Sequence, residues 1–366
     1  MEKVKLVDIC NPKQWKTIPT NELMEDGYPV YGANGIIGYY SEFNHENSVI
    51  AVTCRGATCG SINITVPRAY VTGNAMCLDD VRSDIEMEYL YYCLKHYDFN
   101  NVISGSAQPQ ITRQGMNKIL ISICGHDEQI EIVDKLNKVE KVIELRKQEL
   151  QLLDDLIKAR FVELFGTLEK PVKEFNRATL KELCDKITDG KHGGCTQEEG
   201  TERYFVGARE IYDDEVHYDT APEINVKEFE KDYKRCNIEI GDFLIVNTGA
   251  TIGKSAIATD LRTEHTLLQK SVALLKVKRG LLNPVFLKWC YRVNTKMYMV
   301  ESASAQPNLL LSKINATEIY VPDIVMQEQF ADFVQQVDKS KFIYMAIFIQ
   351  AYKKGRRYGN EFRLFA

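Results

Sequence analysis

The sequence predicts an α+β protein in which two similar mixed α/β domains are joined by two long helices. The first observation behind this prediction is an internal repeat. Short motifs recur in the same order: residues 54–60 return as 247–253, 104–109 as 302–307, and 127–130 as 327–330. The offsets of 193, 198 and 200 are too long for a solenoid repeat, so they indicate duplication of a whole domain with its helix.

The second observation is a helical stretch over residues 126–166, which ends at Gly166. Residues 127–165 contain no proline or glycine, and one stripe follows the 4-3 spacing of a coiled-coil seam. Arg146 and Arg160 lie at the edge of this stripe, where long side chains can snorkel. Its apolar members are Ile132, Leu136, Val139, Ile143, Leu150, Leu153, Ile157 and Leu164.

Residues 326–366 are expected to form the second long helix, with Val334 and Val337 on its seam. We expect the two helices to pair antiparallel and to give the molecule a pseudo-twofold axis, because each helix ends an equivalent repeat. A stalk for homo-oligomerisation is the alternative use of the first stripe. Gly355 and Gly359 each disfavour helix by about 1 kcal/mol relative to alanine, so the helix is expected to fray or break near residue 355.

The two globular domains are assigned to residues 1–125 and 167–325. In the first, residues 28–40 have the pattern of short strands joined by tight turns. Residues 48–52 and 61–66 are expected to form a hairpin around the glycine-rich turn, and residues 87–97 a helix. Residues 285–298 are the expected counterpart of that helix.

The composition is that of an ordinary globular protein, with 45% hydrophobic and 27% charged residues. No apolar run approaches the roughly 18 residues that span a bilayer, and no secretion signal is recognisable, so a cytoplasmic location is expected. The ten cysteines are scattered without ligand spacing, which predicts reduced thiols and no metal. The net charge of −5 requires that any nucleic-acid binding use local basic faces or basic partners.

Gly249–Ser255 is similar to a phosphate-binding loop. A P-loop needs a glycine five positions before its Gly-Lys-Ser, and Thr248 stands there. A P-loop-like nucleotide-binding enzyme is therefore an alternative from a different functional class, but a strand-turn-strand hairpin is the favoured interpretation.

These residues resemble the specificity subunit of type I restriction-modification enzymes over nearly the whole chain. The resemblance rests on the opening turn Tyr31–Gly38 and on motifs that occur twice in one order. These motifs are Arg55–Gly60 with Gly249–Gly253, the two Ala-Gln-Pro loops, and the two Glu-Gln helix starts.

The resemblance implies a non-catalytic DNA-recognition subunit. Its two target-recognition domains each bind one half of an interrupted site in double-stranded DNA. The paired helices set the gap between the halves and dock two methyltransferase subunits, which bind S-adenosylmethionine and methylate adenine. No cofactor is implied in this chain, and a restriction subunit with motor and nuclease activity can join. A related fused or orphan methylation system is the closest alternative, and a purely structural coiled-coil scaffold is another.

Candidate DNA contacts are polar side chains in glycine-flanked loops, because such loops can bring donors to base edges and phosphates. For each single residue a solvated surface role is the competing interpretation. The candidates are Asn34, Arg55, Thr58 and Arg68 in the first domain, and Lys191, His192, Arg203, Arg209 and Lys254 in the second.

Overall fold

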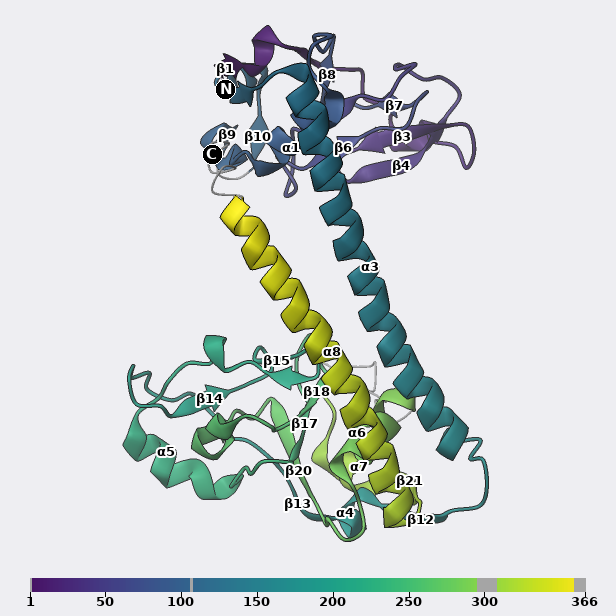
Figure 1. The fold of residues 1–366 in the computed structure, drawn as a ribbon. Coiled ribbons are helices and arrows are strands. Elements are labelled where there is room, and N and C mark those ends of the chain that lie inside the picture. The colour runs from purple at the N-terminus through teal and green to yellow at the C-terminus, as the bar shows by residue number, and fades with distance from the viewer. Residues whose placement is uncertain (1, 106–107, 295–307, 359–366) are drawn as a thin grey trace. The chain divides into compact units, whose positions relative to one another are not determined.

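A computed structural model of the chain describes residues 2–105, 108–294 and 308–358 (Figure 1). These residues divide into two compact units. The first comprises residues 1–147 with residues from 348 onward, and the second comprises residues 148–347. Helix α3, His126–Phe165, and helix α8, Ile324–Tyr358, each contribute to both units.

The first unit contains a four-stranded antiparallel sheet in the order β2-β8-β5-β6. A second sheet, β4-β3-β7, includes the parallel pair β3–β7, and β1 pairs with β11 just before α3. The elements are β1 Glu2–Lys5, β2 Asn11–Gln14, β3 Tyr28–Gly32, β4 Gly35–Tyr40, β5 Ile50–Thr53, β6 Ile62–Ile64, β7 Tyr70–Val71, β8 Ala75–Asp79, α1 Met87–His96, β9 Ile103–Ser104, β10 Gln110–Ile111, α2 Arg113–Met116 and β11 Leu120–Ile123.

The second unit repeats this plan. Its four-stranded sheet has the order β13-β20-β17-β18, its parallel pair is β14–β19, and β12 pairs with β21 just before α8. The elements are β12 Asn176–Thr179, α4 Leu180–Leu183, β13 Cys184–Asp189, β14 Tyr204–Val206, β15 Ile211–Tyr212, β16 Glu215–Val216, α5 Val226–Asp232, β17 Phe243–Val246, β18 Ser255–Ile257, β19 Thr266–Leu268, β20 Val272–Val277, α6 Pro284–Val293, α7 Leu311–Ala316 and β21 Glu318–Val321.

The structure therefore confirms that the two halves share one mixed α/β topology. The predicted hairpin is β5–β6, and the predicted helix over 87–97 is α1. Its counterpart is α6, which ends at Val293, so the last residues of the predicted range 285–298 lie outside the described part of the chain. Most of the two Ala-Gln-Pro loops, residues 106–107 and 302–307, also lies outside it.

Each central sheet is buried on both faces, and its side chains alternate between two cores. In the second unit Ile245 and Leu275 face α6, whereas Leu244 and Leu274 face the parallel pair β14–β19. The period of two between facing residues is what a pleated strand imposes. The same alternation separates the two cores of the first unit.

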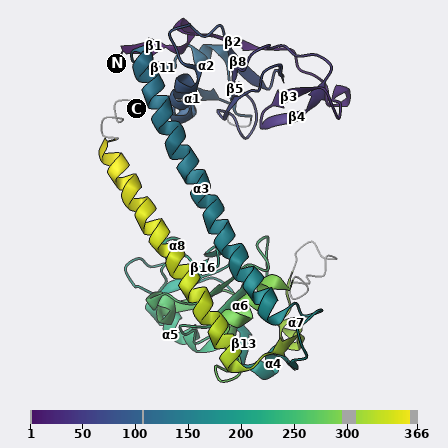
Figure 2. The ribbon, with the colours of Figure 1, turned by 45° about the vertical axis from the view of Figure 1, so that its right-hand side comes forward.

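Within the second unit, the end of α3 packs against the beginning of α8, as Figures 1 and 2 both show. The rings of Phe161 and Phe330 lie 5.3 Å apart, and Lys341 Nζ lies 2.6 Å from Asp154 Oδ1. Since the earlier α3 residue meets the later α8 residue, the two segments run antiparallel here.

The burial of α3 follows the predicted seam at both ends. Ile132 in the first unit and Ile157 in the second are buried, and Leu136, Ile143, Leu150, Leu153 and Leu164 are partly buried. Val139 departs from this pattern, with an exposed fraction of 51%. In α8, Val334 and Val337 are buried in the core that contains Phe330.

A buried glutamine fixes the start of each long helix. Its position shows that the two helices align at a different offset from the one predicted. Gln129 Oε1 accepts from Glu86 N, and its Nε2 donates to the carbonyls of Asp84 and Cys124, at 2.8–3.1 Å. Gln327 makes the same three bonds, with Asn283 N, Leu281 O and Pro322 O, at 2.8–3.1 Å. The offset here is 198, so the sequence match of 127–130 with 327–330 at offset 200 was two residues out of register.

The helix has no break at Gly355 itself, because α8 continues to Tyr358, and residues 359–366 lie outside the described part of the chain. One glycine costs a helix only about 1 kcal/mol relative to alanine, which a long run of neighbouring helical residues can offset.

Replacing Gln327 by alanine should lower the free energy of unfolding by at least about 2 kcal/mol, because three buried backbone groups lose their partner. Gln329→Ala is the matched control, since Gln329 is exposed and should change stability by less than about 0.5 kcal/mol. Urea unfolding of both variants measures this. Equal losses of stability in the two variants would contradict the alignment of Gln129 with Gln327.

Candidate nucleic-acid interface

In each unit, several loops meet at one edge of the four-stranded sheet. Strands β13 and β17 are both antiparallel to β20, so their carboxyl ends lie at the same edge. The loops that follow them, Gly190–His192 and Asn247–Gly253, therefore come together there. The turn after β14 joins them, because Ala208 N donates to Ser271 Oγ at 3.2 Å and Thr251 Oγ1 to Ala208 O at 3.5 Å.

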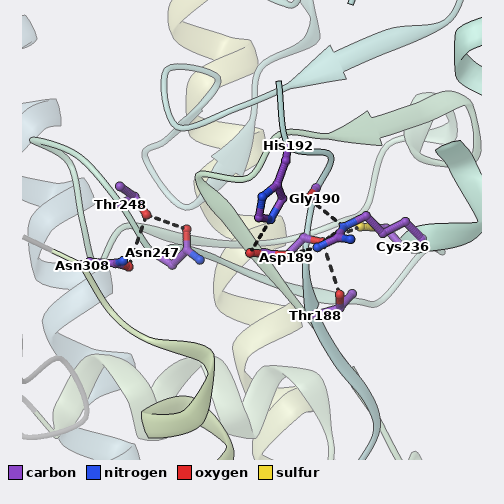
Figure 3. Close-up of polar contacts among 9 residues, drawn as sticks. Thr188, Asp189, Gly190, His192, Cys236, Asn247, Thr248 and Asn308 are labelled. Atoms are coloured by element: carbon purple, nitrogen blue, oxygen red, sulfur yellow. Dashed lines mark hydrogen bonds and ion pairs between the residues drawn. The ribbon is translucent and has the colours of Figure 1, made fainter. Parts of the chain in front are cut away.

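The loop after β13 is held by the buried carboxylate of Asp189 (Figure 3). Arg235 forms an ion pair with this carboxylate, and its Nε donates to the carbonyls of Asp189 and Gly190 at 3.0 and 2.9 Å. Burial raises the pKa of the Cys236 thiol to about 11, so this thiol stays protonated and donates to Asp189 O at 3.4 Å. His192 then extends to solvent, with Nε2 3.4 Å from Asp189 Oδ2.

The loop after β17 is tied to residues 308–309. Thr248 Oγ1 lies 3.3 Å from Asn247 Oδ1 and 3.4 Å from Asn308 Oδ1 (Figure 3). Leu309 N donates to Asn247 O at 2.7 Å. The first unit has the same bond, from Ile111 N to Cys54 O at 3.0 Å. Arg55 also forms an isolated backbone β-bridge with Gln110, as Thr248 does with Asn308.

The glycine-rich turns also have the same backbone hydrogen bonds in both units. Gly60 N donates to Thr53 O and Gly253 N to Val246 O, each at 2.8 Å. Gly56 and Gly249 adopt φ of +91° and +103°, a region that disfavours other residues. The two units thus have the same backbone structure at this edge but carry different exposed side chains.

Asn34 and Arg209 occupy equivalent positions at the two edges. In the parallel pairs, Thr72 N donates to Tyr31 O at 3.0 Å, and Gln269 N donates to Val206 O at 2.8 Å. Asn34 and Arg209 each stand three residues after the accepting carbonyl, in the turn that reaches the edge. Both are exposed.

The family model for the type I restriction modification DNA specificity domain matches residues 1–154 and 172–346. The chain belongs to this family. A type I restriction enzyme EcoprrI specificity subunit from Escherichia coli is 28% identical over 111 residues, which are 30% of this chain and 27% of that protein. The chain thus matches about a quarter of the length of that curated relative.

Solved structures show the same fold. A type I restriction-modification S subunit from M. genitalium has a TM-score of 0.57 at 15% identity, covering 95% of this chain and 92% of that one. A chain from a structural study of complex assembly and conformational transition in the type I R-M system has a TM-score of 0.56 at 17% identity, covering 97% and 94%.

The structure brings most of the predicted contacts of this specificity protein to the two edges. In the first unit Asn34 lies in one loop of this edge and Arg55 and Thr58 in another. The two loops are joined by the hydrogen bond from Thr53 Oγ1 to Ala33 O. In the second unit His192 and Arg209 lie at the edge. Lys254 follows the glycine-rich turn there and is exposed.

Three predicted contacts are placed differently. Lys191 Nζ lies 2.7 Å from Asp232 and 3.5 Å from Glu228, and its side chain is only 18% exposed. Arg203 precedes β14 and bonds His265 Nδ1 at 2.6 Å, so it lies at the opposite end of the parallel pair from Arg209. Arg68 precedes β7, at the opposite end from Asn34, and pairs with Glu46 at 3.2 Å.

Two edge residues were missed by sequence reasoning. Lys270 is exposed and its N–H donates to Lys191 O at 2.9 Å, and Asn308 pairs with Thr248. Neither stands in a glycine-rich motif, although Asn308 directly follows the repeated Ala-Gln-Pro sequence. Their position depends on strand pairing that the sequence does not display.

The P-loop-like alternative is wrong. Lys254 and Ser255 lead into strand β18, which pairs antiparallel with β17. A P-loop leads into a helix whose amino terminus faces the phosphate. Among the described residues, no helix has the length and apolar character to cross a membrane.

Arg235→Met should destabilise the second unit by about 1–2 kcal/mol, because it leaves the buried Asp189 carboxylate without its cation. The same substitution should raise the rate of amide hydrogen exchange at Gly190 and Lys191. Arg209→Met is the control, since the Arg209 guanidinium forms no ion pair with any described residue. Unchanged exchange in the Arg235 variant would show that the loop is held by other contacts.

Proposed function

We propose that this chain is the DNA-sequence-specificity subunit of a type I restriction-modification complex and performs no chemistry of its own. Each unit recognises one half of an interrupted site in double-stranded DNA. The observation that carries this proposal is the duplicated sheet edge: the same backbone hydrogen bonds present different exposed side chains in the two units.

The side chains at the two edges suit recognition of different bases. An asparagine can form two hydrogen bonds with adenine, whereas an arginine can form two with guanine. Asn34 and Arg209 occupy equivalent positions, so one scaffold offers an adenine-type contact in the first unit and a guanine-type contact in the second. Thr58 and the exposed lysines Lys254 and Lys270 supply donors for phosphates.

The acidic net charge of −5 is compatible with this role if partners supply part of the positive field. The proposed partners are two methyltransferase subunits that bind S-adenosylmethionine, with a restriction subunit in systems that cleave DNA. Outside its seam, α3 carries exposed leucines on which such partners can dock. Leu145 in the first unit is 52% exposed, and Leu152 and Leu156 in the second unit are 66% and 49% exposed.

The long helices are proposed to form an antiparallel coiled coil that sets the gap between half-sites, with a pseudo-twofold relation between the repeats. Two observations support this. The end of α3 packs antiparallel to the start of α8 within the second unit. The seam residues Leu136 and Val139 of α3 also match Val334 and Val337 of α8 at the same offset of 198 as the buried glutamines.

Arg209→Met and Asn34→Ala should each relax recognition in a different half of the site. Losing one bidentate contact costs about 1–3 kcal/mol, or about 5- to 150-fold in affinity for the preferred base. The measurement is competition binding of the reconstituted methyltransferase complex to duplexes with single-base changes in each half.

Arg68→Met is the matched control. It removes an exposed side chain of the first unit that lies at the opposite end of the β3–β7 pair from Asn34, so recognition in both halves should persist. If Arg68→Met relaxed recognition as strongly as Asn34→Ala, or if both edge variants affected the same half, the assignment of one half-site to each edge would be incorrect.

A further inference from the structure

The first unit contains a compact cluster of a histidine, a cysteine and a carboxylate beneath the parallel pair β3–β7. Cys77 and Asp79 are two residues apart in β8, so their side chains leave the same face of the strand. His45 reaches them from the loop after β4. One ligand atom from each residue lies within 4.8 Å of the others, and Cys77 is fully buried.

Hydrogen-bond geometry shows that the ring of His45 faces an oxygen acceptor on both sides. Asn44 Nδ2 donates to Val71 O at 3.0 Å and Asn44 Oδ1 accepts from Val71 N at 2.9 Å, which fixes the amide orientation. His45 Nδ1 lies 2.6 Å from this Oδ1, and Nε2 lies 3.0 Å from Asp79 Oδ1.

A neutral imidazole has only one N–H, and Nδ1 uses it toward Asn44. The lone pair of Nε2 then faces Asp79 Oδ1, so the two atoms can bind one cation together. At an N···O distance of 3.0 Å the cation lies beside the line that joins them, about 2 Å from each atom.

The surrounding hydrogen bonds are those expected around metal ligands. A ligating histidine usually donates its second N–H to an oxygen that fixes the ring, and ligating carboxylates are themselves hydrogen-bonded. Asn44 does this for His45, and the indole Nε1 of Trp15 donates to Asp79 Oδ2 at 3.2 Å. Trp15 also packs edge-on against the His45 ring, at 5.2 Å between centroids.

We propose that His45 Nε2, Cys77 Sγ and an Asp79 carboxylate oxygen bind one zinc-type divalent ion, with a water as fourth ligand. Nitrogen, thiolate and carboxylate donors in fourfold coordination match the preferences of Zn²⁺. The site is structural: it joins the loop that carries His45 to the central sheet. It belongs to the first unit alone, because Leu274 and Lys276 hold the positions equivalent to Cys77 and Asp79. It is independent of the proposed DNA function.

The test uses Co²⁺ as a spectroscopic substitute for Zn²⁺ on the full-length chain, after treatment with a chelator. One equivalent of Co²⁺ should produce a thiolate-to-cobalt charge-transfer band and tetrahedral d–d bands, and Zn²⁺ should displace both. Cys77→Ser and His45→Gln should abolish the charge-transfer band, while Cys10→Ser should retain it. Cys10 is another buried cysteine of the same unit, and its Sγ donates to Leu6 O.

Trp15→Phe keeps the aromatic packing but removes the hydrogen bond to Asp79, so it should weaken Co²⁺ binding by about 10- to 100-fold. Absence of a charge-transfer band in the parent protein would overturn the proposal without any variant. A band that persists in Cys77→Ser, with circular dichroism like that of the parent, would also overturn it. In either case the cluster is not the proposed metal site.

Discussion

The start of each long helix depends on one buried side-chain amide. Gln129 and Gln327 each bind the carbonyl just before the helix and two backbone groups in the segment that leads to α1 or α6. The amide therefore joins two pieces of chain that are distant in sequence: the start of the long helix and the segment before α1 or α6. Because hydrogen bonds are directional and a buried unsatisfied amide is costly, this contact restricts the direction in which the helix leaves its domain.

This constraint on helix direction matters for the duplicated sheet edge, which needs a fixed orientation relative to its helix. A helix that sets the gap between two half-sites is useful only if each recognition surface keeps a constant orientation on its own helix. Within each unit, the sheet carries the edge loops at one end and packs on one face against α1 or α6. The segment before that helix is bound by the glutamine. In the proposed reader, the backbone of the edge is constant and the exposed side chains vary, so half-site specificity can change without changing the fold.

The sequence was sufficient to predict features that depend on local pattern. The glycine-rich turns, the hairpin β5–β6, helix α1 and the long helix α3 all have their own periodicity or turn residues. The register of the second helix was wrong because the full Glu-Gln motif matches at offset 200, whereas at offset 198 only the glutamine matches. Only the burial of Gln327, with Gln329 exposed, decides between them.

Features that depend on pairing between distant residues were not predictable. Lys191 looked like a free cation in a flexible loop, but Glu228 and Asp232 of α5 bind it. Arg203 and Arg68 stand near the right strands but at the opposite end from the edge, and only the parallel pairing of β14–β19 and β3–β7 reveals this. His45 lies more than thirty residues before Cys77, a separation outside the short spacings by which metal sites are recognised.

The central claim is that two copies of one recognition unit bind separate parts of a DNA site. The most direct measurement is modification-sensitive sequencing of a genome methylated by this chain together with its methyltransferase partner. The account predicts a methylated motif of two different short specific sequences separated by a fixed number of unspecified base pairs. A continuous motif without a gap, or methylation independent of sequence, would contradict it.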